Sequence, residues 1–180
     1  MDGARLVARL RAELGAAAVL DDPDVTASYS HDMMPLADRA QPLAVVFPED
    51  VEGVQATVRA CAEAGVPIVP RGAGSGLSGA ANAVEGCVVL VLTKMDRILE
   101  IDPGNRLAVV QPGVVNLDFR EAVAKHGLFY PPDPSSYDWC TIGGNLATNA
   151  GGLCCVKYGV TTDSVLGLKV VLADGSLLKT

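Results

Sequence analysis

The sequence contains few aromatic residues, only two histidines, and fewer basic than acidic residues. Aromatic residues make up 4% of the 180 positions, so a buried core must consist chiefly of aliphatic side chains. The 14 lysines and arginines against 21 aspartates and glutamates give a net charge of −7. This charge argues against nonspecific binding to nucleic acid or to an anionic membrane. With 49% hydrophobic and 19% charged residues, the composition is that of a folded domain.

The chain also lacks a long apolar run and any paired-cysteine motif. No stretch reaches the roughly 18 apolar residues of a membrane span. Residues 1–14 alternate arginines with apolar residues, which indicates an amphipathic helix rather than a signal peptide. The five cysteines are odd in number and include no Cys-x-x-Cys pair, so no metal site is predicted. We therefore expect a cytoplasmic protein with reduced thiols.

Hydrophobic periodicity predicts a strand–helix–strand unit in the first half of the chain. Asp50 is expected to cap the helix of this unit, and Gly65 to end it. The expected elements are a helix at 1–14, a polar lead-in with a turn and a short helical piece at 21–39, a strand at 43–47, a helix at 50–65 and strands at 66–69 and 87–92.

The second half predicts antiparallel structure. The turn sequence 102–105 joins strands at 98–102 and 107–111, and Asp174-Gly175 marks a second hairpin. Asn116 is expected to cap a helix that runs to about residue 127. A rigid, proline-rich segment at 129–136 and a strand at 165–172 complete this half.

Residues 70–79, Pro-Arg-Gly-Ala-Gly-Ser-Gly-Leu-Ser-Gly, form a glycine-rich loop after an apolar strand. Successive backbone N–H groups in such a loop bind phosphate or diphosphate. The loop formally contains G-x-G-x-x-G, but the short segment 80–86 leaves no room for the helix that a nicotinamide-binding domain requires. A Walker loop is excluded because no Gly-Lys-Ser/Thr ending follows.

Other residues that invite a catalytic or redox role have simpler interpretations. His31 lies in a polar loop without an evident partner, and His126 suits the last turn of a helix. The adjacent Cys154 and Cys155 could form a redox disulfide, but two reduced thiols are the expected state.

Three ordered motifs carry a resemblance to a known family: residues 70–79, residues 131–136 (Pro-Pro-Asp-Pro-Ser-Ser) and residues 141–152 (Thr-Ile-Gly-Gly-Asn-Leu-Ala-Thr-Asn-Ala-Gly-Gly). Together with 157–159 and 166–175, they resemble the flavin-binding half of FAD-linked oxidases with a p-cresol methylhydroxylase (PCMH) type of domain. The glycolate oxidase flavoprotein subunit, D-lactate dehydrogenase and D-2-hydroxyglutarate dehydrogenase are members of this group.

The resemblance implies an α+β fold. It consists of a small subdomain containing the βαβ unit, followed by a subdomain with a mixed or antiparallel sheet and flanking helices. The implied division is a lead-in at 1–40, a first FAD-binding subdomain with the pyrophosphate loop at 41–112, and the start of a second, incomplete one at 113–180. Because such relatives continue into a substrate domain, we expect a fragment truncated at its C-terminus, inactive alone.

The resemblance also implies which residues bind FAD. The first loop would hold the pyrophosphate, the proline-rich segment would approach the flavin and its ribityl chain, and the last motif would line the isoalloxazine and the diphosphate. The implied FAD-binding residues are Pro70, Arg71, Gly72, Ala73, Gly74, Ser75, Gly76, Leu77, Ser78, Gly79, Pro112, Gly113, Pro134, Ser135, Ser136, Thr141, Ile142, Gly143, Gly144, Asn145, Ala147, Asn149, Gly151, Gly152, Tyr158 and Gly159.

Some members of the group attach FAD through a loop histidine, where this chain has Ser75, so noncovalent FAD is predicted. Cys140 lies near the position of a covalent cysteine in other relatives. The implied function is oxidation of a 2-hydroxy acid by hydride transfer to FAD, with a separate electron acceptor. Catalytic residues are not assigned, and a homo-oligomer stays open. The alternatives are a flavin-binding or interaction fragment without turnover and a relative acting on another substrate.

Overall fold

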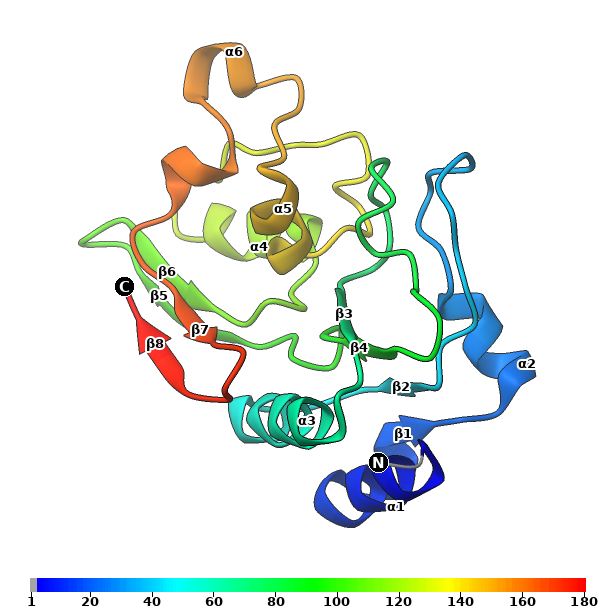
Figure 1. Cartoon of the computed structure of the whole chain (residues 1–180). Coiled ribbons are helices and arrows are strands. Elements are labelled where there is room, and N and C mark those ends of the chain that lie inside the picture. The colour runs from blue at the N-terminus through cyan, green and yellow to red at the C-terminus, as the bar shows by residue number, and fades with distance from the viewer. Residues whose placement is uncertain (1–2) are drawn as a thin grey trace.

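The computed structural model describes residues 3–180 and centres on a four-stranded sheet with the order β1-β2-β4-β3 (Figure 1). Its strands are β1 (Val19–Leu20), β2 (Ala44–Val46), β3 (Ile68–Arg71) and β4 (Val88–Val91). β4 lies between β2 and β3 and runs parallel to both, whereas β1 is antiparallel to β2. The predicted βαβ unit is therefore present, with a later strand inserted at its centre.

Alternate residues of the sheet face two different layers. Ala44, Val46 and Val88 pack on the side of helices α1 (Gly3–Leu14) and α3 (Val51–Ala64). Val45 and Val89 face the other side, where they pack with Ala83, Cys87 and the aromatic rings of residues 29 and 47. Since both faces of these central strands are buried, they appear in the sequence as continuous apolar runs.

Helix α3 begins and ends as its sequence predicts. The Asp50 side chain accepts a hydrogen bond of 2.8 Å from the Gly53 N–H, and Gly65 ends the helix with a φ of +68°. Cys61 lies on the inner face and is fully buried. Burial raises the pKa of its thiol to about 11, so this cysteine stays protonated in the core.

Asp50→Ala is expected to lower the free energy of unfolding by about 1 kcal/mol, because the first turn of α3 loses its side-chain acceptor. For a chain of this length the melting temperature should fall by about 2–4 °C. Differential scanning calorimetry measures the shift. Asp50→Asn, which retains an acceptor oxygen, is the matched control, and an equal loss in both variants would contradict the capping role.

The short helix α2 (Pro23–Thr26) lies between β1 and β2 in the chain, and after β4 the chain forms the hairpin of β5 (Ile98–Asp102) and β6 (Leu107–Val110). Helices α4 (Asn116–Ala124) and α5 (Ile142–Thr148) pack on this hairpin around Phe119, Val123 and Ile142. The N-cap of α4 is Val115, not Asn116 as expected. Asn116 is instead the first helical residue, and its side chain is turned into the core.

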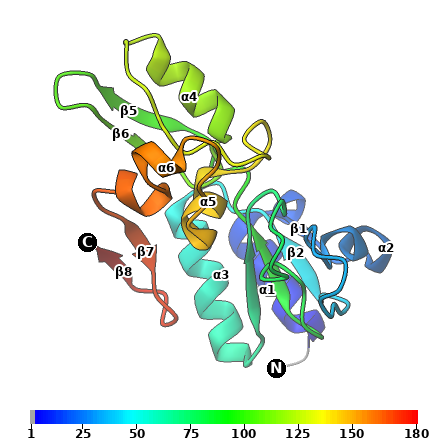
Figure 2. The same ribbon diagram turned by 90° about the horizontal axis from the view of Figure 1, so that it is seen from above.

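The chain ends in a hairpin of β7 (Lys169–Val171) and β8 (Leu177–Lys179), which lies beside α3 (Figures 1 and 2). Its turn is fixed to α3 by two hydrogen bonds. The Gln55 side chain donates to the Gly175 carbonyl at 2.6 Å, and the Arg59 guanidinium donates to the same oxygen at 2.9 Å. The end of the chain is thus fastened to a helix of the first sheet.

Two local predictions differ from the structure. The strand expected over 165–172 is limited to β7, and the motif at 142–152 contains helix α5, which the sequence reading did not anticipate. A further short helix, α6 (Cys155–Tyr158), follows it. Within residues 3–180, no helix combines the length and the apolar character needed to cross a bilayer.

Candidate functional site

The glycine-rich loop leaves the sheet at the carboxyl end of β3, the edge at which α/β sheets commonly bind ligands (Figure 1). Within the described residues 3–180, the backbone N–H groups from Ala73 to Ser78 have no hydrogen-bond partner. Gly74 adopts a φ of +82°, a conformation that other residues rarely take. A run of unpaired N–H groups in a turned backbone forms a concavity suited to an anion.

Gly72 brings the first loop against the last motif. A Cβ atom at this position would overlap the Thr141 hydroxyl oxygen and would lie 3.7 Å from the Cα of Gly144. Thr141 is the N-cap of α5, and its hydroxyl accepts a hydrogen bond of 3.3 Å from the Gly144 N–H. Two stretches that are about seventy residues apart in the sequence therefore touch, and only glycine allows this approach.

Arg71 places a cation directly beside the loop. A Cβ atom on Gly74 would lie 2.5 Å from the guanidinium carbon of Arg71. The guanidinium donates to the His31 carbonyl at 2.7 Å and lies over the Tyr29 ring. Burial lowers the pKa of Arg71, while the nearby Asp32 carboxylate favours its charged form. An arginine remains protonated at neutral pH, so the guanidinium places one positive charge beside the loop, with the Asp32 carboxylate nearby.

The N–H groups at the start of α5 are, in contrast, already used within the protein. Ile142 donates to the Val114 carbonyl and Gly143 to the Pro112 carbonyl, both at 2.8 Å. The Asn145 N–H donates to the Thr141 carbonyl at 2.9 Å. The start of α5 therefore packs closely against the glycine-rich loop but offers a ligand none of these N–H groups. The free N–H donors lie in the loop.

The Pro112-Gly113 turn has a packing reason for its glycine. A Cβ atom on Gly113 would overlap the carbonyl oxygens of Leu92 and Met95, and one on Gly143 would lie 2.7 Å from the Pro112 Cβ. The Gly113 N–H also donates to the Met95 carbonyl at 2.7 Å. Both glycines allow the Pro112-Gly113 turn to lie between the chain after β4 and the start of α5.

A buried cluster of polar side chains joins the start of α4, the proline-rich segment and α5. The Asn116 amide donates to the Asn145 side-chain oxygen at 2.9 Å and to the Pro132 carbonyl at 3.1 Å. The Asn145 amide donates in turn to the Cys140 sulfur at 3.2 Å. The Asn116 side-chain oxygen is the buried polar atom without a partner in the described residues. The cluster fixes the proline-rich segment relative to the start of α5.

The proline-rich segment is also paired with the glycines that end the last motif. Asp133 donates its N–H to the Gly151 carbonyl at 2.9 Å, and its carboxylate accepts from the Cys154 N–H at 3.0 Å. Burial alone would raise the pKa of Asp133, but the hydrogen bonds from Cys154 and the charge of Arg120 hold it below its ordinary value. The hydrogen bond with Asp133 raises the pKa of the Cys154 thiol, which therefore is not an activated nucleophile.

Ser135 and Ser136 lie at the centre of a turn that follows the paired residue Asp133. The turn is closed by the Tyr137 N–H, which donates to the Pro134 carbonyl at 2.8 Å. In the described part of the chain the hydroxyl groups of both serines have no hydrogen-bond partner. These hydroxyls are therefore available to a ligand.

The contacts of Tyr158 and Gly159 are with residues 129 and 163, not with the glycine-rich loop. The Tyr158 ring packs edge-on against Phe129 with centroids 5.6 Å apart, and a Cβ on Gly159 would overlap the Asp163 carboxylate. Asn149 ends α5 with a φ of +50°, and its side chain accepts a 2.9 Å hydrogen bond from the Thr162 N–H. Among the other predicted residues, Leu77, Ser78 and Ala147 are exposed.

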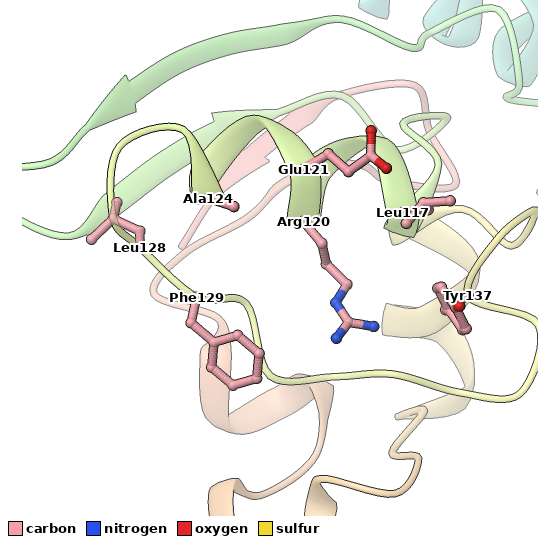
Figure 3. A pocket seen from close by; sticks show the side chains of 7 residues that line it. All are labelled: Leu117, Arg120, Glu121, Ala124, Leu128, Phe129 and Tyr137. Carbon is pink, nitrogen blue, oxygen red and sulfur yellow. The ribbon is translucent and has the colours of Figure 1, made fainter.

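A shallow groove of about 350 Å³ lies next to this aromatic pair, on the outer side of α4 (Figure 3). Arg120 points into it and lies 5.3 Å from the centre of the Tyr137 ring. The groove is lined by Leu117, Arg120, Glu121, Ala124, Leu128, Phe129 and Tyr137. None of these residues belongs to the glycine-rich loop.

Sequence reasoning missed the residues that hold the loop from behind, chief among them Asn82 and segment 30–40. No motif marks them, and their contacts join positions more than forty residues apart. The one local signal is a polar residue, Asn82, three positions after the last glycine of the loop.

Comparison with known protein families places the site in context. The FAD binding domain family matches residues 42–180, which is most of the chain. The chain is similar to the glycolate oxidase subunit GlcD of Bacillus subtilis, with 49% identity over 152 residues, covering 84% of this chain and 32% of the relative.

Two further relatives have different names. The D-lactate dehydrogenase of Anaerostipes hadrus is 40% identical and the match covers 93% of this chain and 35% of the relative. The D-2-hydroxyglutarate dehydrogenase of Stutzerimonas stutzeri is 41% identical and the match covers 97% and 37%. The chain thus spans about a third of the length of the curated relatives it matches.

The fold also matches that of a solved structure. The structure of p-cresol methylhydroxylase with substrate bound matches with a TM-score of 0.83 at 32% identity, over 98% of this chain and 35% of that protein. The α+β architecture expected from the sequence is therefore confirmed.

Proposed function

Because the chain belongs to the FAD binding domain family and its cofactor is FAD, we propose that it is the FAD-holding part of an oxidoreductase that oxidises a small 2-hydroxy acid. The observation that carries this proposal is the run of free N–H groups at 73–78, held against the Thr141 motif by the contact at Gly72. The relatives named for glycolate, D-lactate and D-2-hydroxyglutarate support the substrate class.

The residues of the first loop fit the diphosphate of FAD. Its free N–H groups can each donate to a phosphate oxygen, and Arg71 adds positive charge at the loop. This local charge is needed because the net charge of the chain is −7, which repels an anion at longer range. In this proposal the backbone N–H groups of the loop bind the diphosphate, and the positive charge of Arg71 strengthens that binding.

The residues around Ser135 and Gly144 suit the flavin end of the cofactor. Small side chains let a flat ring approach the backbone, and the free serine hydroxyls can bind the polar ribityl chain or ring edge. When bound, FAD supplies the two-electron chemistry that removes a hydride from the α-carbon of the substrate. The protein contributes the position and the electrostatic surroundings of the ring.

We propose that FAD is bound without a covalent link. Ser75 occupies the loop position where some relatives have an attachment histidine. Cys140 is 2% exposed, and its sulfur accepts a hydrogen bond from Asn145. A thiol turned into the core in this way is not presented to a ligand in the loop.

The chain incubated with FAD and passed through a desalting column is expected to retain a visible flavin absorption band. Treatment with acid or heat should release all of this flavin into the supernatant, because only noncovalent contacts hold it. Loss of the band on the column, with the protein shown to be folded by circular dichroism, would contradict the proposed FAD site. Flavin that stayed with the precipitated protein would contradict noncovalent binding.

The activity belongs to a longer protein in this proposal. We propose that the groups which select the 2-hydroxy acid and accept its proton lie in the part of the relatives that this chain does not span, and that electrons then pass to a separate acceptor.

Bleaching of the flavin band by D-lactate, glycolate or D-2-hydroxyglutarate in a longer version would identify the substrate. A flavin that none of these acids reduces would instead favour a binding module or another substrate. Cytoplasmic location and the oligomeric state stay predictions.

A further inference from the structure

The glycine-rich loop is held from behind by residues 30–40, which we name the clamp segment. The two segments lie side by side at the edge of the sheet, where the chain after α2 passes the loop after β3 (Figure 1). The Met33 N–H donates to the Gly76 carbonyl at 3.0 Å. Ala83, just after the loop, pairs with both ends of the clamp segment: it donates to the Ser30 carbonyl and accepts from the Ala40 N–H, each at 2.9 Å.

Asn82 is the side chain that joins the clamp segment to the loop. Its oxygen accepts from the Asp32 N–H at 2.8 Å. Its amide nitrogen donates to the carbonyls of Ala37 at 3.3 Å and Asp38 at 3.0 Å. The side chain is 7% exposed and uses three bonds on one segment. Asn82 therefore fixes the whole bend of the clamp segment around the end of the loop.

The clamp segment and the loop also pack in direct contact. A Cβ atom on Gly79 would lie 2.6 Å from the Ala37 Cβ, and one on Gly76 would lie 3.4 Å from a carboxylate oxygen of the buried Asp32. The Arg71 guanidinium crosses between the two segments to reach the His31 carbonyl. The carbonyl of Gly76 is therefore drawn toward the clamp segment, while the N–H groups from 73 to 78 stay free.

A loop of glycines has many accessible conformations, and binding an anion requires that one of them be selected. Donors that are already aimed at the ligand bind more tightly, because no ordering cost remains to be met on binding. The clamp segment supplies this order from residues that precede the family match at 42–180.

We propose that Asn82 is a positioning residue for diphosphate binding, which acts by fixing the clamp segment so that the loop presents its N–H groups to the ligand. This inference rests on the proposed FAD site. It assigns to residues 30–40 a part in cofactor binding, although none of them needs to touch the cofactor.

The test compares Asn82→Ala with Gln41→Ala by titration with FAD and with ADP, which carries the diphosphate without the flavin. Gln41 is the matched control because its amide donates to Pro23 and Thr26, on the side of α2 and away from the loop. We expect Asn82→Ala to bind both ligands about tenfold more weakly, and Gln41→Ala to bind them as the unchanged chain does. Unchanged affinity in Asn82→Ala, or an equal loss in both variants, would overturn the inference.

Two measurements keep the test decisive if Asn82→Ala is poorly folded or if no ligand binds. In the unchanged chain, ADP should slow amide hydrogen exchange at Met33, Ala40 and Ala83 as well as in the loop, and protection confined to the loop would overturn the inference. If the unchanged chain bound neither FAD nor ADP, the proposed function would fall. Tryptic cleavage after Arg71 would then still test the clamp, since it should be faster in Asn82→Ala than in Gln41→Ala, and equal rates would overturn it.

Discussion

Gly72→Ala is expected to weaken FAD binding by at least about tenfold. The added Cβ would overlap the Thr141 hydroxyl and approach the backbone at Gly144. Thr141 is 2% exposed and is held as the N-cap of α5, so it has little room to withdraw. The loop must then separate from the last motif, which divides the two surfaces that we propose bind the cofactor. Fluorescence titration with FAD measures the loss.

A second substitution makes the cause testable. Thr141→Ala removes the overlapping oxygen, so the double variant Gly72→Ala/Thr141→Ala should bind FAD more tightly than Gly72→Ala alone. Gly104→Ala, in the β5–β6 turn, is the control for a glycine replacement away from the site. If the loss of FAD affinity in the double variant equalled the sum of the losses in Gly72→Ala and Thr141→Ala, steric overlap at Thr141 would not be the mechanism.

Asn145→Ala is expected to cost about 2–4 kcal/mol of unfolding free energy, the largest stability effect predicted here. The substitution removes the acceptor of the Asn116 amide and the donor to Cys140, both in a buried cluster. Asn116 would then be left with one amide bond and a side-chain oxygen that already lacks a partner. The melting temperature should fall by roughly 4–16 °C for a chain of this length, as calorimetry would show.

The matched control is Asn105→Ala, which removes an exposed amide that donates to Asp102 in a surface turn. Its cost should stay within about 0.5 kcal/mol, because water replaces the lost partner. A similar melting temperature for the two variants would show that the buried amide cluster contributes no more than an exposed pair.

The elements that could be predicted from the sequence are those fixed by local patterns. The helix between Asp50 and Gly65 has its cap and its stop in the sequence, and the turn at 102–105 defines the β5–β6 hairpin. The continuous apolar run at 87–92 indicates a buried strand. For the helix and the hairpin, the deciding interactions join residues close together in the chain. The strand is indicated by its apolar run alone, since its partners β2 and β3 are distant in the sequence.

The parts that could not be predicted depend on distant contacts. Helix α5 contains Gly143 and Gly144, which disfavour a helix, and its first N–H groups are paired with residues 112 and 114. Asn116 looked like a cap because it precedes an apolar periodic run, but Asn145 and Pro132 draw its side chain inward. The glycine-rich loop was recognised from its sequence, whereas the clamp segment behind it was not, since its hydrogen bonds to Asn82 leave no local pattern. The roles of individual residues toward FAD and the subdomain boundary at 112 stay predictions.

The fastening of the last hairpin to α3 also bears on the order in which the protein is built. Gln55 and Arg59 precede their shared acceptor, the Gly175 carbonyl, by 120 and 116 residues in the sequence. A ribosome making the chain from its N-terminus must therefore synthesise residues 1–175 before this closure can form, and closures over such long stretches of chain are slow. The glycine-rich loop at 70–79 is therefore synthesised well before the hairpin that is fastened to α3. All four strands of the first sheet precede residue 92, so this sheet can form while the hairpin that α3 will hold is still unmade.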